Sequence, residues 1–153
     1  MHEHYLFITQ DGEDENGKRS SALSIVKDRL AKKTWPVFES TRFKTIVKKG
    51  DIIFFYIAGI KEKKGLVVYS AEIECVEKPT KDTIIDPHSF NNCFAIIKLK
   101  NISPTKEIVL KNCLIDGNLI DPNNKKWGAF LMGGVSKVTQ EFASTYLLEH
   151  TSD

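Results

Sequence analysis

At 153 residues, with 41% hydrophobic and 27% charged residues, the chain has the size and composition of a globular domain with a full hydrophobic core. It contains no apolar run of about 18 residues, and MHEHYLFITQ has no basic region followed by a long apolar stretch, so we expect neither a transmembrane helix nor a signal peptide. The net charge of +2 is too small to indicate nucleic-acid binding by itself.

The predicted elements begin with a strand over Tyr5–Thr9. Ser20 or Ser21 then caps an amphipathic helix that runs to about Lys33. The following TWPVFEST is predicted as irregular, because a proline restricts the residue before it. Residues 43–47 suggest a helical turn before Gly50.

The clearest local pattern lies in residues 48–79. Gly50 allows the positive φ of a tight turn, and Asp51 can hydrogen-bond its own backbone. Ile52–Ala58 is a run of β-branched and aromatic residues, typical of a buried strand. A second strand follows with period-two alternation, and its predicted inner face consists of Val67, Tyr69, Ala71, Ile73 and Cys75.

The rest of the chain predicts a strand over Phe94–Ile102, an edge strand over Glu107–Leu110 and an irregular segment up to Trp127. Thr139 caps a final helix whose inward residues are Phe142, Ala143, Tyr146 and Leu147. This order of elements predicts a single domain, residues 1–153, with a small α+β fold and a barrel-like sheet.

Enzyme and metal signatures are absent from the sequence, which has no GxSxG, HExxH or P-loop motif. Cys75, Cys93 and Cys113 form no CxxC pair and are odd in number, which favours free thiols in a reducing cytoplasm. We therefore expect no metal, no cofactor and no catalysis.

Aromatic residues are the better indication of function. Trp35 and Trp127 both lie outside the predicted regular elements, where a tryptophan either closes the core from its rim or stacks a planar ligand. Stacking a base on an aromatic ring is worth about 1–3 kcal/mol. Lysines near these segments are either solvated loop charges or phosphate contacts, and the set comprises Lys48, Lys49, Lys61, Lys63 and Lys64.

Several landmarks occur in the order found in EVE domains, a branch of the PUA-like superfamily. They are YLFIT, TWPV, KKGDIIFFYIAG, VVYSAEIECVEKP and NNKKWGAFLMGGVSKVTQEFASTYLL. The chain thus resembles this family over nearly its whole length, although it has Tyr5-Leu6-Phe7 where many relatives have Tyr-Trp-Leu. The resemblance implies a PUA-like curved antiparallel β-barrel with peripheral helices.

The resemblance also implies a partner, a DNA or RNA carrying a modified base that flips into an aromatic pocket. Trp35 and Trp127 would stack or wall the base, Tyr56 and the backbone near Ile57 and Ala58 would read its polar edge, and the lysines would hold the phosphates. The expected pocket residues are Trp35, Pro36, Val37, Phe38, Tyr56, Ile57, Ala58, Ser70 and Trp127.

Two alternatives stay open at this point. The related ASCH branch includes amidohydrolases acting on modified nucleosides, and that activity would need Lys33, Thr34 and Glu72 to converge. A protein-interaction module with no nucleotide ligand is the other alternative. The sequence fixes neither the kind of nucleic acid nor the oligomeric state.

Overall fold

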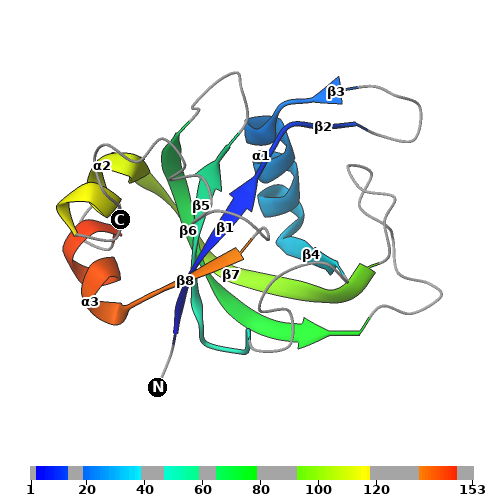
Figure 1. Ribbon diagram of the computed structural model, residues 1–153. Coiled ribbons are helices and arrows are strands. Elements are labelled where there is room, and N and C mark those ends of the chain that lie inside the picture. The colour runs from blue at the N-terminus through cyan, green and yellow to red at the C-terminus, as the bar shows by residue number, and fades with distance from the viewer. Residues whose placement is uncertain are drawn as a thin grey trace.

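Six strands form one strongly curled sheet in the order β4-β7-β6-β5-β1-β8 (Figure 1). The computed structural model describes residues 3–13, 19–38, 47–58, 65–78, 93–117 and 135–147. The strands of the sheet are β1 (His4–Thr9), β4 (Thr34–Phe38), β5 (Ile52–Ile57), β6 (Leu66–Glu77), β7 (Cys93–Val109) and β8 (Val135–Val138). Because β4 and β8 are the two edges of the sheet, the curl gives an open half-barrel.

The helices lie on both sides of this sheet. α1 (Ala22–Lys32) covers the concave side, and α2 and α3 lie together on the convex side (Figure 1). α2 spans Leu110–Asp116, and α3 (Gln140–Phe142) continues as a π-helical segment, η2 (Ala143–Leu147). A short hairpin of β2 (Gly12–Glu13) and β3 (Arg19–Ser20) precedes α1. None of the helices in these ranges is long and apolar enough to cross a membrane.

Strand pairing is antiparallel throughout the sheet, with one exception. β1 and β5 are parallel, with His4 opposite Ile52 and Thr9 opposite Ile57. Parallel neighbours require a crossover connection, and the long segment that contains α1 and β4 supplies it. The expected α+β fold with a curved sheet and peripheral helices is confirmed, with this one parallel pair in a mainly antiparallel sheet.

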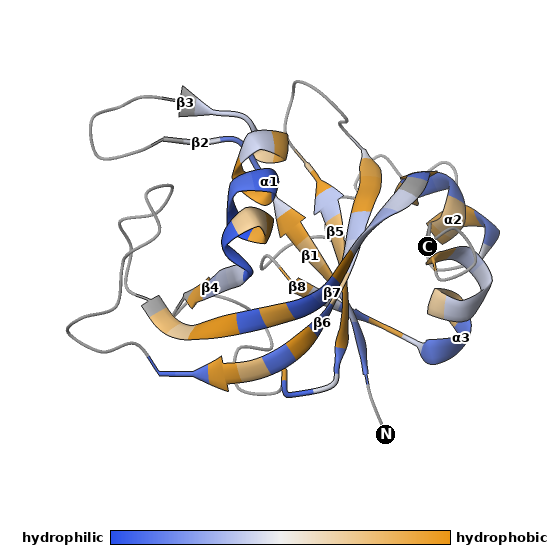
Figure 2. Cartoon of the chain, turned by 180° about the vertical axis from the view of Figure 1, so that it is seen from behind, coloured by the Kyte–Doolittle hydropathy of each residue, from blue (hydrophilic) through white to orange (hydrophobic). Residues whose placement is uncertain are grey.

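Side-chain alternation on β5 divides the interior into two cores. Ile53, Phe55 and Ile57 point into the first core, which lies between the concave face and α1. Phe54 and Tyr56 point the other way, into a second core under α2 and α3. Figure 2 shows the same alternation as hydrophobic and hydrophilic bands along β6 and β7.

The turn before β5 has the structure that its sequence predicts. Gly50 has φ 92°, and Asp51 is fully buried. One carboxylate oxygen accepts the backbone N–H of Lys48 at 3.0 Å, and the other accepts that of Glu3, also at 3.0 Å. Asp51 therefore fastens both its own turn and the segment that leads into β1.

Both predicted helix caps are confirmed. The Ser21 hydroxyl accepts the N–H of Ser24 at 3.2 Å at the start of α1, and the Thr139 hydroxyl accepts the N–H of Phe142 at 3.0 Å at the start of α3. The α1 helix ends at Lys33, which adopts the left-handed conformation with φ 57°. The predicted helical turn over 43–47 lies largely outside the described residues.

Two predicted segments are wrong, and a third is right only in part. Residues 34–38 form strand β4, because the edge position needs fewer backbone donors and so accommodates Pro36. Residues 107–109 are in a strand, as expected, but they form the end of β7 rather than a separate strand, and Ile108 and Val109 pair with β6. The supposedly irregular segment after them begins with α2. Local sequence hides both results, because the strand pairing and the second core stabilise these segments.

The predicted inner face of β6 is wrong at Val67. The pairing with β5 shifts between Phe55 and Tyr56, so that Val68 is an extra residue in β6. Val67 consequently packs in the second core, whereas Val68, Ala71 and Ile73 face the first.

Candidate functional site

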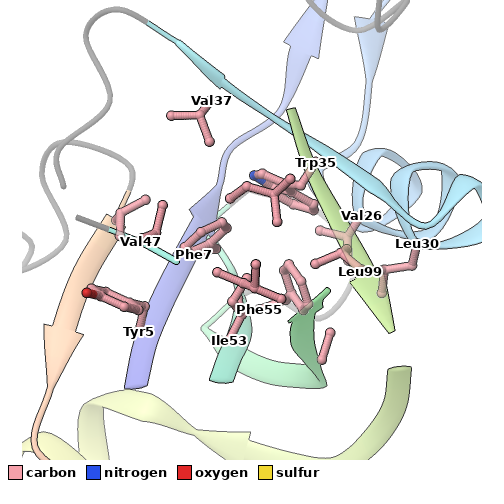
Figure 3. Packing of buried hydrophobic residues seen from close by; sticks show 14 of the residues in the cluster. Tyr5, Phe7, Val26, Leu30, Trp35, Val37, Val47, Ile53, Phe55 and Leu99 are labelled. Atoms are coloured by element: carbon pink, nitrogen blue, oxygen red, sulfur yellow. The ribbon is translucent and has the colours of Figure 1, made fainter. Parts of the chain in front are cut away.

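The concave side of the half-barrel, between edge strands β4 and β8, is the part of the structure best suited to a planar ligand. Aromatic and aliphatic side chains line it from β1, β4 and the segment before β5 (Figure 3). Tyr5 and Phe7 form its floor, Trp35 and Val37 come from β4, and Val47 lies nearby. These side chains are at most 7% exposed, so they form a packed core and only its rim is available to a ligand.

Trp35 does not lie in an exposed loop, as the sequence suggested, because it is part of β4 and only 6% exposed. Its ring centroid is 4.8 Å from that of Phe55 and 5.9 Å from that of Phe7. The guanidinium carbon of Arg29, on α1, lies 4.7 Å from the centroid of the indole. The indole is thus a core residue whose rim reaches the concave side.

Three other predicted pocket residues lie on the opposite side of the sheet. Tyr56 is buried in the second core, and Ala58 packs against the same core. Ser70 pairs with Phe54, whose ring also belongs to that core, so Ser70 shares its face. The expectation that Tyr56 is close to Trp35 at one cleft is wrong, because adjacent residues of a strand point to opposite faces.

The remaining predicted pocket residues divide between the concave side and the undescribed segments. Val37 and Ile57 face the first core with Trp35, and Pro36 is half-buried on β4. Phe38 ends β4 opposite Cys93, and its side chain lies outside the described part. Trp127 also lies outside the described residues.

Tyr5, Phe7 and Val47 belong to the concave side but were missed in the sequence-based prediction. Their signal was present, because Tyr5 and Phe7 alternate with Leu6 along a predicted strand. The alternation indicates that β1 has two faces, but it does not indicate which face packs against β4, the strand that carries Trp35. Only the curl of the sheet brings β1 and β4 together over Phe55.

The expected phosphate-binding lysines are in two separate places along the chain. Lys48 and Lys49 are exposed in the turn before β5, and neither makes an ion pair with a described residue. Lys61, Lys63 and Lys64 lie outside the described residues, in the connection between Ile57 and Gly65, whose backbones are hydrogen-bonded at 2.8 Å. Since the six residues of β5 span roughly 20 Å, the turn and that connection mark opposite ends of the strand.

The three residues that an ASCH-like amidohydrolase would need do not converge on the concave side. Thr34 pairs with Lys98, and Glu72 pairs with Lys100, so both point to the convex face. The Glu72 carboxylate is engaged there by Lys100 at 3.3 Å. Lys33 is exposed at the end of α1. The geometry gives this trio no shared site.

Metal and thiol chemistry find little support among the ranges that the structure describes. Those ranges contain no group of three or more His, Cys, Asp or Glu side chains placed to hold a metal ion. Cys75 and Cys113 are free thiols, and burial raises the pKa of both. A raised pKa lowers the thiolate fraction at neutral pH and hence the nucleophilicity.

The hydroxyl of Tyr5 is the most strongly shifted acid on the concave side. Burial, with the negative charges of Asp51 and Glu3, raises the pKa of Tyr5 to about 12 from its ordinary value of 10.0. The group is therefore a neutral phenol at physiological pH and can donate a hydrogen bond.

Because the pKa of Tyr5 is raised, the free energy of unfolding should depend on pH in the alkaline range. The pKa of Tyr5 is higher in the folded protein than in the unfolded chain. The stability that the neutral Tyr5 phenol contributes is therefore fully present below about pH 10 and is lost as the pH rises toward 12. We expect the free energy of unfolding to fall over this window and Tyr5→Phe to fall less steeply. Chemical denaturation at about pH 9 and about pH 11.5 measures this difference. The burial of Tyr56 raises its pKa too, so Tyr5→Phe reduces the slope without abolishing it, and equal slopes would contradict the assignment.

Comparison with protein-family models and with curated proteins gives no match. Among solved structures, the crystal structure of human THYN1 in complex with 5-methylcytosine-containing DNA covers 94% of this chain and 94% of that chain, at 16% identity and a TM-score of 0.61. The NMR structure of Rpa0253 from Rhodopseudomonas palustris covers 94% of this chain and 90% of that one, at 18% identity and a TM-score of 0.57. Identities this low establish the fold alone, and the α+β fold with a curved sheet and peripheral helices expected from the sequence is confirmed.

Proposed function

We propose that this chain, which has the PUA-like fold of EVE domains, binds nucleic acid and reads a modified base without catalysing a reaction. The observation that carries the proposal is the similarity over 94% of the chain to THYN1, a protein crystallised with 5-methylcytosine-containing DNA. The proposal also rests on the residues of the concave side, because function depends on the site and not on the fold.

The base would lie against the rim of the concave side, at Trp35 and Val47, with Tyr5 and Phe7 behind them. Extruding a base from a duplex costs a few kcal/mol, and contacts in the protein must offset that cost. Apolar contacts at this rim would supply part of that free energy. The absence of a convergent nucleophile, acid and base among Lys33, Thr34 and Glu72 supports binding rather than turnover.

A matched oligonucleotide screen tests the proposal. We expect a DNA duplex with one 5-methylcytosine to bind more tightly than the same duplex with cytosine, as measured by fluorescence anisotropy. Parallel RNA oligonucleotides and other modified bases establish the kind of nucleic acid and the modification. Binding to none of these oligonucleotides or to the free modified nucleosides would overturn the proposal and favour a protein-interaction module.

Lys48 and Lys49 provide the second test. Both are exposed beside Val47, and as cations they would contact phosphates without reading the base. Replacing both with glutamine should weaken modified and unmodified duplexes about equally, and should flatten the plot of log affinity against log salt by about one unit per lost contact.

Lys27 offers a matched control for that experiment, because it is an exposed lysine on α1 away from this turn. Lys27→Gln should leave the salt slope unchanged. If the double variant keeps the wild-type salt slope, Lys48 and Lys49 do not contact phosphates. That result would not bear on whether the protein recognises the base.

A further inference from the structure

We infer that Trp35 recognises its ligand through the N–H edge of the indole, by donating a hydrogen bond, and that stacking on its ring is not its role. The inference rests on the proposed function and assigns a different task to the residue from which stacking was expected. The inference follows from two observations: protein groups already pack against the indole ring, and the indole N–H has no hydrogen-bond acceptor among the described residues.

The faces of the indole are occupied by protein. The rings of Phe55 and Trp35 are tilted by 41° with centroids 4.8 Å apart, and Phe7 packs at 56° and 5.9 Å. The guanidinium of Arg29 lies over the ring at 4.7 Å, in a cation–π contact. A base could stack on Trp35 only after displacing one of these groups.

The nitrogen edge is in the opposite situation. The indole N–H of Trp35 donates no hydrogen bond to any residue in the described ranges, although the side chain is only 6% exposed. In Figure 3 the nitrogen lies at the end of the indole toward Val37, away from Val26 and Leu30 of α1. Buried tryptophan N–H groups usually have a partner, and a ligand acceptor would complete this one.

The backbone holds this donor in place before any ligand arrives. Trp35 pairs with Ile97 of β7, and the left-handed residue Lys33 starts the strand by accepting the N–H of Leu99 at 2.9 Å. Pro36 fixes its own φ directly after the tryptophan. A donor held in this way loses little conformational entropy on binding, which favours affinity and selectivity together.

The matching ligand group is an acceptor in the plane of a ring, either a carbonyl oxygen or an unprotonated ring nitrogen. A purely stacking tryptophan would accept any planar base, because every base has a π-face. A buried donor discriminates instead, since a ligand without the acceptor leaves it unpaired. We therefore expect Trp35 to affect which base is bound.

The test uses Trp35→Phe, which keeps an aromatic ring against Phe55 and Arg29 but removes the N–H. We expect it to bind a 5-methylcytosine duplex about 3- to 10-fold more weakly than wild type, the range for one lost hydrogen bond. Phe142→Leu, in the second core, is the matched control for reduced packing and should bind as wild type does.

A direct readout is the ¹H–¹⁵N spectrum of the indoles, since the chain has two tryptophans and Trp35→Phe identifies the signal of Trp35. This signal should shift when the 5-methylcytosine duplex saturates the wild-type protein. Wild-type binding with an unmoved Trp35 signal, or undiminished binding by Trp35→Phe, would overturn this inference and leave the proposed function standing. Failure of the wild type to bind any nucleic-acid probe would overturn both.

Discussion

Replacing Trp35 with alanine is expected to lower the free energy of unfolding by about 3–5 kcal/mol, the range for truncating a buried tryptophan. The side chain is 6% exposed and contacts Phe7, Phe55 and Arg29, so its removal leaves a cavity between β4, α1 and the concave face. Urea denaturation measures the loss.

Val109→Ala is a suitable control for that measurement, because Val109 is 44% exposed at the end of β7 and its truncation should change stability by about 0.5 kcal/mol or less. A Trp35→Ala variant as stable as this control would mean that the indole is not a core residue. The expected loss also makes Trp35→Ala a poor probe of binding, because a weakened core would reduce affinity whatever the role of the ring.

Replacing Asp51 with alanine is expected to cost about 3 kcal/mol, because each hydrogen bond to a buried charged group contributes about 1.5–3 kcal/mol. The carboxylate is fully buried and accepts the N–H groups of Glu3 and Lys48, each at 3.0 Å. Its removal leaves both amides without an acceptor and loosens the attachment of β1 to the turn before β5.

Two variants of the same turn sharpen this measurement. Asp51→Asn keeps one acceptor oxygen, so we expect an intermediate loss. Lys49→Ala changes an exposed side chain of the turn and should stay within about 0.5 kcal/mol of wild type. Comparable losses for Lys49→Ala and Asp51→Ala would contradict the role assigned to the carboxylate.

The relation between Trp35 and Tyr56 limits where a base could bind. Both residues were expected at one pocket, but Phe55, directly before Tyr56 in β5, points toward Trp35 while Tyr56 points into the second core. A ligand at the rim near Trp35 would therefore not meet Tyr56, which lies on the other side of the sheet.

Features that depend on a few neighbouring residues were predictable from the sequence alone. The caps at Ser21 and Thr139 and the Gly50–Asp51 turn are of this kind, because their hydrogen bonds join residues three apart in the chain. The existence of β5 and β6 also followed from their residue patterns, as did the α+β fold with its curved sheet through the order of elements along the chain.

Only the tertiary structure decided what surrounds each candidate residue. Trp35 became a core residue because an edge strand accommodated Pro36 and because the curl of the sheet brought Phe7, Phe55 and α1 around the indole. The extra residue in β6 turned Val67 to the convex side, although the alternation in its sequence continues unbroken. Burial and the choice of face depend on which distant strands pair and where the register shifts, and neither is encoded in the local pattern that identifies a strand.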